Sequence, residues 1–139
     1  GKCAGGCAMV LQIMSKVFQI EVEDIGALSL QSQRRIDFNT GCAVFAETEA
    51  VSRIAEGVAK EDLLAGIHRA LAAQINSLAE RVGIERDYAL VGGGARDIGL
   101  VKAVEEIAGF NIIVPPEPHL TAALGAAVIA REKLNMAEV

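Results

Sequence analysis

A chain of 139 residues, 52% of them hydrophobic, is long enough for one domain with its own core. Its formal net charge is −5, and it has no cluster of Lys and Arg. This excludes a nucleic-acid partner, because a protein that binds nucleic acid needs positive charge on one face to neutralise the phosphates. No apolar run reaches the roughly 18 residues that cross a bilayer, and no signal-peptide pattern is present, so we expect a cytoplasmic protein without a membrane partner.

Helical periodicity dominates the chain up to residue 82. Apolar residues recur three and four positions apart in four successive segments, a pattern that predicts amphipathic helices. The predicted helices span residues 6–18, 23–32, 40–57 and 60–82. In the third of them, Thr40 is the expected N-cap, and the expected apolar face carries Val44, Phe45, Val51 and Ile54.

The period of the pattern changes after Gly83. Residues 88–91 are an apolar run that stops at three glycines, and residues 111–118 are a second apolar run closed by prolines, so each predicts a short buried strand. Helices are predicted over residues 98–108 and 120–134. This β-α-β-α order predicts an α/β fold with several helices and a small parallel sheet. Because no repeat or linker interrupts the chain, residues 1–139 are treated as one domain.

The glycine run that follows the first predicted strand is the first chemical signal. Gly92, Gly93 and Gly94 let a ligand approach the backbone, and the helix that follows offers N–H groups to an anion or a nucleotide. Arg96 could contact a phosphate or stack on a base. A tight turn without any ligand is an equally good explanation of this segment alone.

The cysteines are the second chemical signal. Cys3 and Cys42 each lie at the predicted start of a helix, where the helix dipole favours the thiolate. A [4Fe–4S] cluster takes four thiolates, so two per chain suffice if a second chain supplies two more across a two-fold axis. Three alternatives stay open: a zinc site with one histidine, a redox pair of Cys3 with Cys7, and cysteines that are merely small buried residues.

Several segments, taken together and in order, resemble one family. The segments are KCAGG, CAVFAETE, EDLLAGIHRA, LVGGGARDIGLVKAVEE and ALGAAVIA. They are similar to the ATP-hydrolysing activators of 2-hydroxyacyl-CoA dehydratases and to the related ATPase subunits of benzoyl-CoA reductase. The resemblance covers nearly the whole chain. It implies the ribonuclease H-like fold shared by actin, sugar kinases and heat-shock ATPases.

The same resemblance implies cofactors and partners. Members are homodimers or related heterodimers bridged by one [4Fe–4S] cluster, and they bind ATP or ADP with Mg. ATP hydrolysis is coupled to the transfer of one low-potential electron to an acyl-CoA dehydratase or benzoyl-CoA reductase. A second copy of this chain, or a paralogous subunit, is therefore the expected partner across the two-fold axis.

The resemblance also implies roles for particular residues. Cys3 and Cys42 match the cluster ligands, while Gly66 and Arg69 lie in a helix similar to one that lines the adenine pocket. The residues that match the adenosine-binding turn are Gly92, Gly93, Gly94, Ala95 and Arg96. The first domain of the family, with its phosphate-gripping hairpins and catalytic residues, would precede Gly1. The chain is thus expected to be most of a second domain, inactive as an ATPase by itself.

Two departures from the family and two rival functions complete the predictions. Cys7 stands where threonine is common, and Asp97 stands where asparagine is common.

A small-molecule kinase of the same fold would use the glycine turn without a metal. A non-catalytic interaction module would pack its Ala- and Gly-rich helices against another domain. Iron-independent phosphoryl transfer would select the kinase, and failure to bind iron or nucleotide would select the module.

Overall fold

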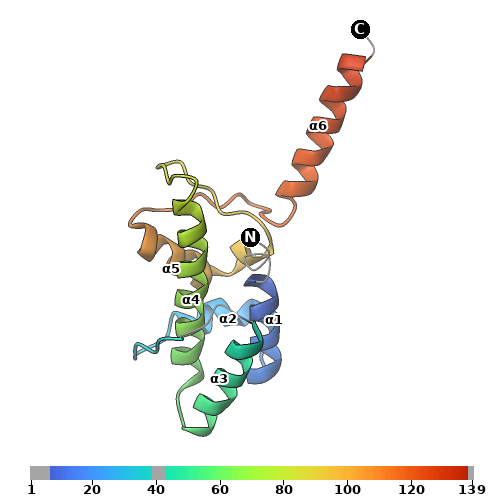
Figure 1. The fold of residues 1–139 in the computed structure, drawn as a ribbon. Coiled ribbons are helices and arrows are strands. Elements are labelled where there is room, and N and C mark those ends of the chain that lie inside the picture. Colours follow the sequence, from blue (N-terminus) through green and yellow to red (C-terminus); the bar gives the residue numbers. More distant parts are fainter. Residues whose placement is uncertain (1–6, 39–42, 138–139) are drawn as a thin grey trace.

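The computed structural model describes residues 7–38 and 43–137 of the chain (Figure 1). Its body is built from the helices α1 (Cys7–Phe18), α2 (Val22–Ser29), α3 (Ala43–Ala55), α4 (Lys60–Glu80) and α5 (Ile98–Ala108). A 3₁₀ helix, η2 (Gly93–Arg96), precedes α5, and α6 (Thr121–Ala137) extends away from the body. The helices predicted from periodicity are confirmed, although Thr40, the expected cap of α3, lies outside the described residues.

α4 lies at the centre of the body. It packs against α2 on one side and α5 on another, while α1 packs against α3. α1 and α3 lie side by side, and both run downward in Figure 1, with α3 beginning lower than α1. The amino-terminal ends of these two helices therefore point in the same direction.

The predicted sheet is reduced, within residues 7–38 and 43–137, to one parallel β-bridge between Ala89 and Ile113. Leu90 N donates to Ile113 O at 3.0 Å, and Ile113 N donates to Tyr88 O at 2.9 Å. The parallel direction follows from the intervening helix α5, because a β-α-β crossover returns the chain in the same sense. Tyr88 and Leu90 are only half-buried, so these strands are less buried than their apolar sequence predicts.

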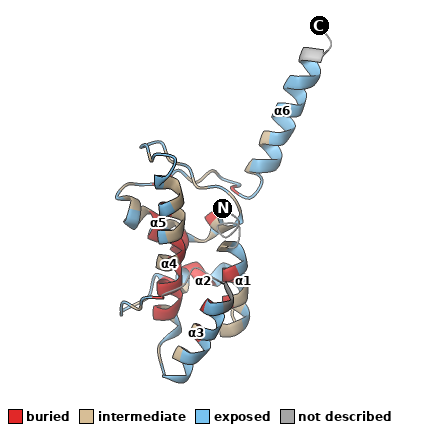
Figure 2. Cartoon of the chain, viewed as in Figure 1, coloured by how far each residue is buried: buried red, intermediate tan, exposed pale blue. Residues whose placement is uncertain are grey.

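The hydrophobic core surrounds the first half of α4, which is buried on every side (Figure 2). The largest completely buried side chains are Met14, Ile25, Leu63, Leu64, Ile67, His68, Leu100 and Val104. The predicted apolar stripe of α4 is buried as far as Leu71, whereas Val82, beyond the end of the helix, is 87% exposed. The core therefore depends on the part of α4 that α2 and α5 cover.

α3 turns a different face toward the body from the one predicted. Phe45, Val51 and Ile54 are 66%, 53% and 40% exposed, while Ala46 and Ala50 are buried. Two alanines one turn apart let the backbones of α3 and α1 approach closely, and larger side chains would hold them apart. The predicted apolar face of α3 was therefore wrong.

α6 carries apolar side chains that are largely uncovered in the described chain. Leu124, Ile129 and Leu134 are 66%, 55% and 67% exposed, and Figure 2 shows an exposed surface along almost the whole helix. Since α6 buries little apolar surface, its Ala-rich sequence and local hydrogen bonds are what favour the helix. Among the helices described, none is both long and apolar enough to cross a membrane.

Asp62, in the first turn of α4, forms hydrogen bonds with the segment that follows α2. Its Oδ1 accepts hydrogen bonds from Ser32 Oγ, Gln33 N and Arg34 N, each at 2.9 Å. The hydrogen bond from Arg34 N, with those from Gln33 N and Ser32 Oγ, lowers the pKa of the Asp62 carboxyl below its ordinary value. The ionised carboxylate is thus the form that stabilises the fold.

We expect Asp62→Asn to lower the urea midpoint at pH 7, because the neutral amide accepts these hydrogen bonds less strongly. A depressed pKa stabilises the fold above the unfolded value of about 3.9, and that stabilisation is lost as pH falls through the folded pKa. The variant should therefore lose less stability than the wild type between pH 7 and pH 3. Asp37→Asn is the control, since the side chain of Asp37 is 72% exposed. Parallel pH profiles for Asp62→Asn and wild type would contradict the assignment.

Candidate functional site

The glycine run forms a tight turn that leads into α5. Gly92 has φ 96°, a left-handed conformation that favours glycine, and its N–H donates to Pro118 O at 2.7 Å. Ala95 N then donates to Gly92 O at 3.1 Å, which closes the turn of η2, and the Ala95 side chain is buried. The backbone of Gly93 and Gly94 is thereby held in one conformation at the edge of the body.

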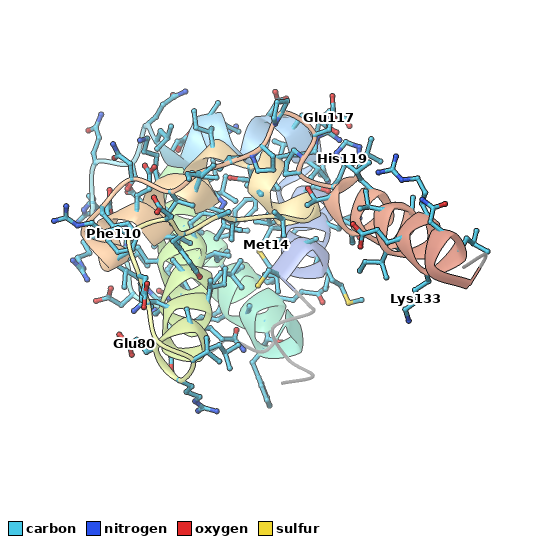
Figure 3. The ribbon with its side chains drawn as sticks, turned by 90° about the horizontal axis from the view of Figure 1, so that it is seen from above. Met14, Glu80, Phe110, Glu117, His119 and Lys133 are labelled. Atoms are coloured by element: carbon cyan, nitrogen blue, oxygen red, sulfur yellow. The ribbon has the colours of Figure 1, made fainter. Side chains whose placement is uncertain are left out.

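A cavity of about 360 Å³ lies beside this turn. We call it the turn cavity, and its lining residues are Ala8, Leu11, Gln12, Val22, Glu23, Gly93, Gly94, Arg96, Asp97 and His119. His119 and Glu117 lie in the segment that leads into α6 (Figure 3), with His119 Nδ1 3.5 Å from Glu117 Oε2. α1, α2, η2 and this segment thus surround a space with both apolar walls and hydrogen-bonding groups, as small-molecule sites usually have.

Asp97 and His68 form a buried pair behind the turn. Asp97 Oδ1 accepts a hydrogen bond from Leu100 N at 2.9 Å, which caps α5, and His68 Nε2 lies 3.2 Å from the same oxygen. The two side chains are 6% and 2% exposed. The geometry of the His68 contact falls short of a hydrogen bond, and Asp97 Oδ2 has no hydrogen-bond partner among the described residues. Asp97, which lines the turn cavity, therefore keeps one buried acceptor atom without a partner in this part of the chain.

The pair can form because Gly26 and Gly99, which have no side chains, let the helices around it pack closely. A Cβ on Gly26 would lie 2.8 Å from Asp97 Oδ1, and a Cβ on Gly99 would lie 2.6 Å from the His68 ring. Both contacts are shorter than Cβ atoms tolerate, so the approach of α2, α4 and α5 depends on these glycines. Nothing in the sequence connects His68 with Asp97, so the pair could not be predicted from it.

Gly66 and Arg69 do not line the turn cavity. Gly66 faces Ile36 O and the Phe38 ring, and Arg69 Nη2 donates to Ile36 O at 2.7 Å. Arg69 lines a second cavity of about 340 Å³, which we call the basic cavity after its lining residues Arg34, Arg35, His68, Arg69 and Lys102. The structure thus separates Arg69 from the glycine turn, and the adenine-pocket role of Gly66 and Arg69 stays a prediction.

Cys3 and Cys42 lie outside the described residues. Cys7, at the start of α1, is half-buried, and burial raises the pKa of its thiol above the ordinary value. A raised pKa disfavours the thiolate that metals bind, so Cys7 is a weaker ligand than an exposed thiol at a helix start. Within the described part of the chain, no three His, Cys, Asp or Glu side chains are placed to hold a metal ion.

The match to known proteins decides the family. The model of the BadF/BadG/BcrA/BcrD ATPase family matches residues 1–130. The chain belongs to this family. It is 41% identical over 129 residues to the 2-hydroxyisocaproyl-CoA dehydratase activator of Clostridioides difficile, covering 93% of this chain and 48% of that protein.

A second relative and a solved structure of the first support the same family. The (R)-2-hydroxyglutaryl-CoA dehydratase activating ATPase of Acidaminococcus fermentans is 39% identical over 132 residues, which cover 95% of this chain and 51% of that protein. The solved activator of the 2-hydroxyisocaproyl-CoA dehydratase from Clostridium difficile, with bound ADPNP, superimposes with a TM-score of 0.84 at 38% identity. That superposition covers 94% of this chain and 50% of the solved one.

These similarities confirm the family resemblance and the fold class. The chain has the α/β fold of the activator ATPases, the actin and heat-shock ATPase type predicted from the sequence. It spans about half the length of the curated relatives that it matches.

Proposed function

We propose that the chain is the adenosine-binding and cluster-bearing half of an ATP-dependent electron activator. The whole protein would hydrolyse ATP and pass one low-potential electron to an acyl-CoA dehydratase or benzoyl-CoA reductase. The observation that carries this proposal is the hydrogen-bonded glycine turn beside the turn cavity. The names of the relatives, which include an activating ATPase and a dehydratase activator, support it.

The turn cavity offers what an adenosine ligand needs. Gly93 and Gly94 present backbone without side chains, so a flat base or a ribose can approach closely. Arg96 is exposed and can stack its planar guanidinium on the base. Asp97 Oδ2 can accept a hydrogen bond from an amino or hydroxyl group of the ligand. The phosphates and Mg would extend toward the part of the whole protein that supplies their ligands.

The proposal predicts that Gly93→Val weakens adenosine binding about tenfold or more. A Cβ on Gly93 has no atom within 4 Å, so the fold tolerates it, but the valine enters the turn cavity. Adenosine and ADP are titrated into the 139-residue chain while amide NMR signals are followed, and the signals of residues 92–96 should shift in the wild type. Gly125→Val in α6 is the matched control, because Gly125 also has open space around it. Equal affinity in both variants would reject the turn cavity as the site.

We assign the cluster to Cys3 and Cys42 with their counterparts in a second copy or a paralogous subunit. α1 begins four residues after Cys3, and α3 begins one residue after Cys42. These two helices pack side by side and run in the same direction, so both proposed thiolates precede positive helix ends that point the same way, which favours one shared cluster. Bound there, a [4Fe–4S] cluster would supply one-electron chemistry at low potential.

α1 offers a physical link between the two sites. Ala8, Leu11 and Gln12 of this helix line the turn cavity, and Cys3 precedes the same helix. A nucleotide that displaces α1 would therefore also displace one of the proposed thiolates. This shared helix supports coupling of nucleotide binding to electron transfer.

A further inference from the structure

The first part of α6 is an uncharged segment whose apolar side chains are uncovered in the described chain. Residues 120–130 carry no charged side chain. The large apolar side chains among them are between 37% and 66% exposed, namely Leu120, Leu124, Val128 and Ile129. Single exposed apolar side chains are normal, but several on one short segment mark a surface that another protein surface covers.

This segment is apolar on every side and not along one stripe. Leu124 and Ile129 are 129 − 124 = 5 positions apart, which places them about 140° apart around the helix axis. Apart from Thr121 at the start of the helix, the other positions up to residue 130 carry Ala, Gly or Val. A surface helix keeps a polar face, whereas a helix that is apolar all round is typically buried. We therefore expect protein on more than one side of this segment.

The body does not supply this cover. Figure 1 shows α6 extending away from the other helices, and within the described residues none of them packs along it. The hydrophobic core draws its buried side chains from elements that precede α6, among them Met14, Ile67 and Val104. The core is thus closed without α6, and the cover of α6 lies outside the body.

The family match indicates what the cover is. The family model matches residues 1–130, so it includes the uncharged segment and ends before Arg131, Glu132 and Lys133. The relatives carry the matched sequence in proteins about twice as long, because the chain covers only 48% and 51% of them. We call the part of an activator ATPase that this chain does not match the complementary half. It is the occupant that the shared, uncovered helix favours.

α6 is also linked to the glycine turn. Gly92 N donates to Pro118 O at 2.7 Å, and α6 begins at Thr121, 121 − 118 = 3 positions later. His119, which lies between these two points, lines the turn cavity. A displacement of α6 would therefore act on the hydrogen bond that closes the turn and on one wall of the turn cavity.

We propose that residues 120–130 are a docking helix enclosed by the complementary half of an activator ATPase, and that docking fixes Pro118 and His119 beside the glycine turn. The docked part ends before Arg131, where charged side chains begin. Docking requires neither adenosine nor an iron–sulfur cluster, so it is tested without either.

The test is co-expression of the 139-residue chain with the complementary half of the 2-hydroxyisocaproyl-CoA dehydratase activator of Clostridioides difficile. The complex is purified through a tag on the 139-residue chain, and a 1:1 complex is expected. The same activator, divided at the same boundary and co-expressed as two halves, is the reference pair. If the reference pair forms a complex and this chain does not, the proposal is overturned.

Light scattering of the isolated chain, without iron, tests a second copy as the occupant. We expect a monomer, because the docking helix is assigned to the complementary half. A dimer that Leu124→Glu dissociates would show that a second copy covers α6, and it would contradict the proposal.

Variants of α6 locate the docked segment. Leu124→Glu and Ile129→Glu should each weaken the complex at least about tenfold, because a buried carboxylate without a partner is costly. Leu134→Glu is the matched control, since it makes the same change on the same helix, at a side chain that is 67% exposed, but beyond residue 130. Unchanged affinity in Leu124→Glu and Ile129→Glu, or an equal loss in Leu134→Glu, would reject residues 120–130 as the docked segment.

Amide NMR signals of the chain, alone and in the complex, test the link to the glycine turn. The signals of Gly92 and His119 should shift when the complementary half is bound, because docking acts through Pro118 on the turn. The signal of Ile67, in the core around α4, should move less. Unchanged signals of Gly92 and His119 in a complex that forms would reject the link between docking and the turn.

Discussion

Replacing Cys42 with Ser is expected to abolish the iron content and the visible absorbance of protein reconstituted anaerobically with iron and sulfide. On a two-fold axis, one substitution per chain removes two of four thiolates, and the remaining two cannot hold a [4Fe–4S] cluster. Wild type should contain about four irons and as many sulfides per dimer. Chemical analysis measures the iron and sulfide content, and light scattering measures whether the protein is a dimer.

Cys7→Ser is the matched control for this experiment. It is the same chemical change in a cysteine near the start of α1, but burial raises the pKa of the Cys7 thiol and so disfavours its thiolate. Iron content should therefore survive in Cys7→Ser. Loss of iron in Cys7→Ser with retention in Cys42→Ser would overturn the assignment of the ligands.

The sequence predicted the helices well because each carries its own local signal. α5 begins at the N-cap Asp97 and ends at Gly109, which is left-handed with φ 78°. Both limits depend on residues within one turn of the helix end, and such signals can be read without the fold. The glycine turn is also local, since Gly92 needs its left-handed conformation whatever surrounds it.

The buried face of each helix was harder to predict, because it depends on which neighbouring helices pack against it. α3 buries Ala46 and Ala50 rather than Phe45, since α1 approaches its small residues. The first half of α4 is buried on every side, so periodicity could not assign Arg69 to the basic cavity rather than to the turn cavity.

The His68–Asp97 pair shows the limit of sequence reasoning at the site. Twenty-nine positions separate the two residues, 97 − 68 = 29, and their contact requires both Gly26 and Gly99. A histidine between Ile67 and Arg69 of α4 has no sequence signal that distinguishes a buried partner from solvent. The pair lies between the two cavities, since His68 lines the basic cavity and Asp97 lines the turn cavity.

Gly66→Ala is expected to destabilise the fold by about 2 kcal/mol, even though alanine is the better helix former. The helical preference for Ala over Gly contributes about 1 kcal/mol in favour of the variant. Against it, the new Cβ would lie 2.5 Å from Ile36 O and 2.9 Å from the Phe38 ring. A backbone carbonyl cannot rotate away, so the segment before α3 must move, and the cost lies at the upper end of the usual range for overpacking, about 3 kcal/mol. The melting temperature should fall by roughly 5–10 °C.

Gly125→Ala separates the packing effect from helical preference. Gly125 lies in α6 with no atom within 4 Å of a built Cβ, so this variant gains the preference and meets no obstacle. Its melting temperature should be unchanged or slightly higher, while its helical circular dichroism should rise. If Gly66→Ala were as stable as Gly125→Ala, the segment of Ile36 and Phe38 would not pack on α4. Arg69 would then lose the carbonyl of Ile36 that orients its guanidinium toward the basic cavity.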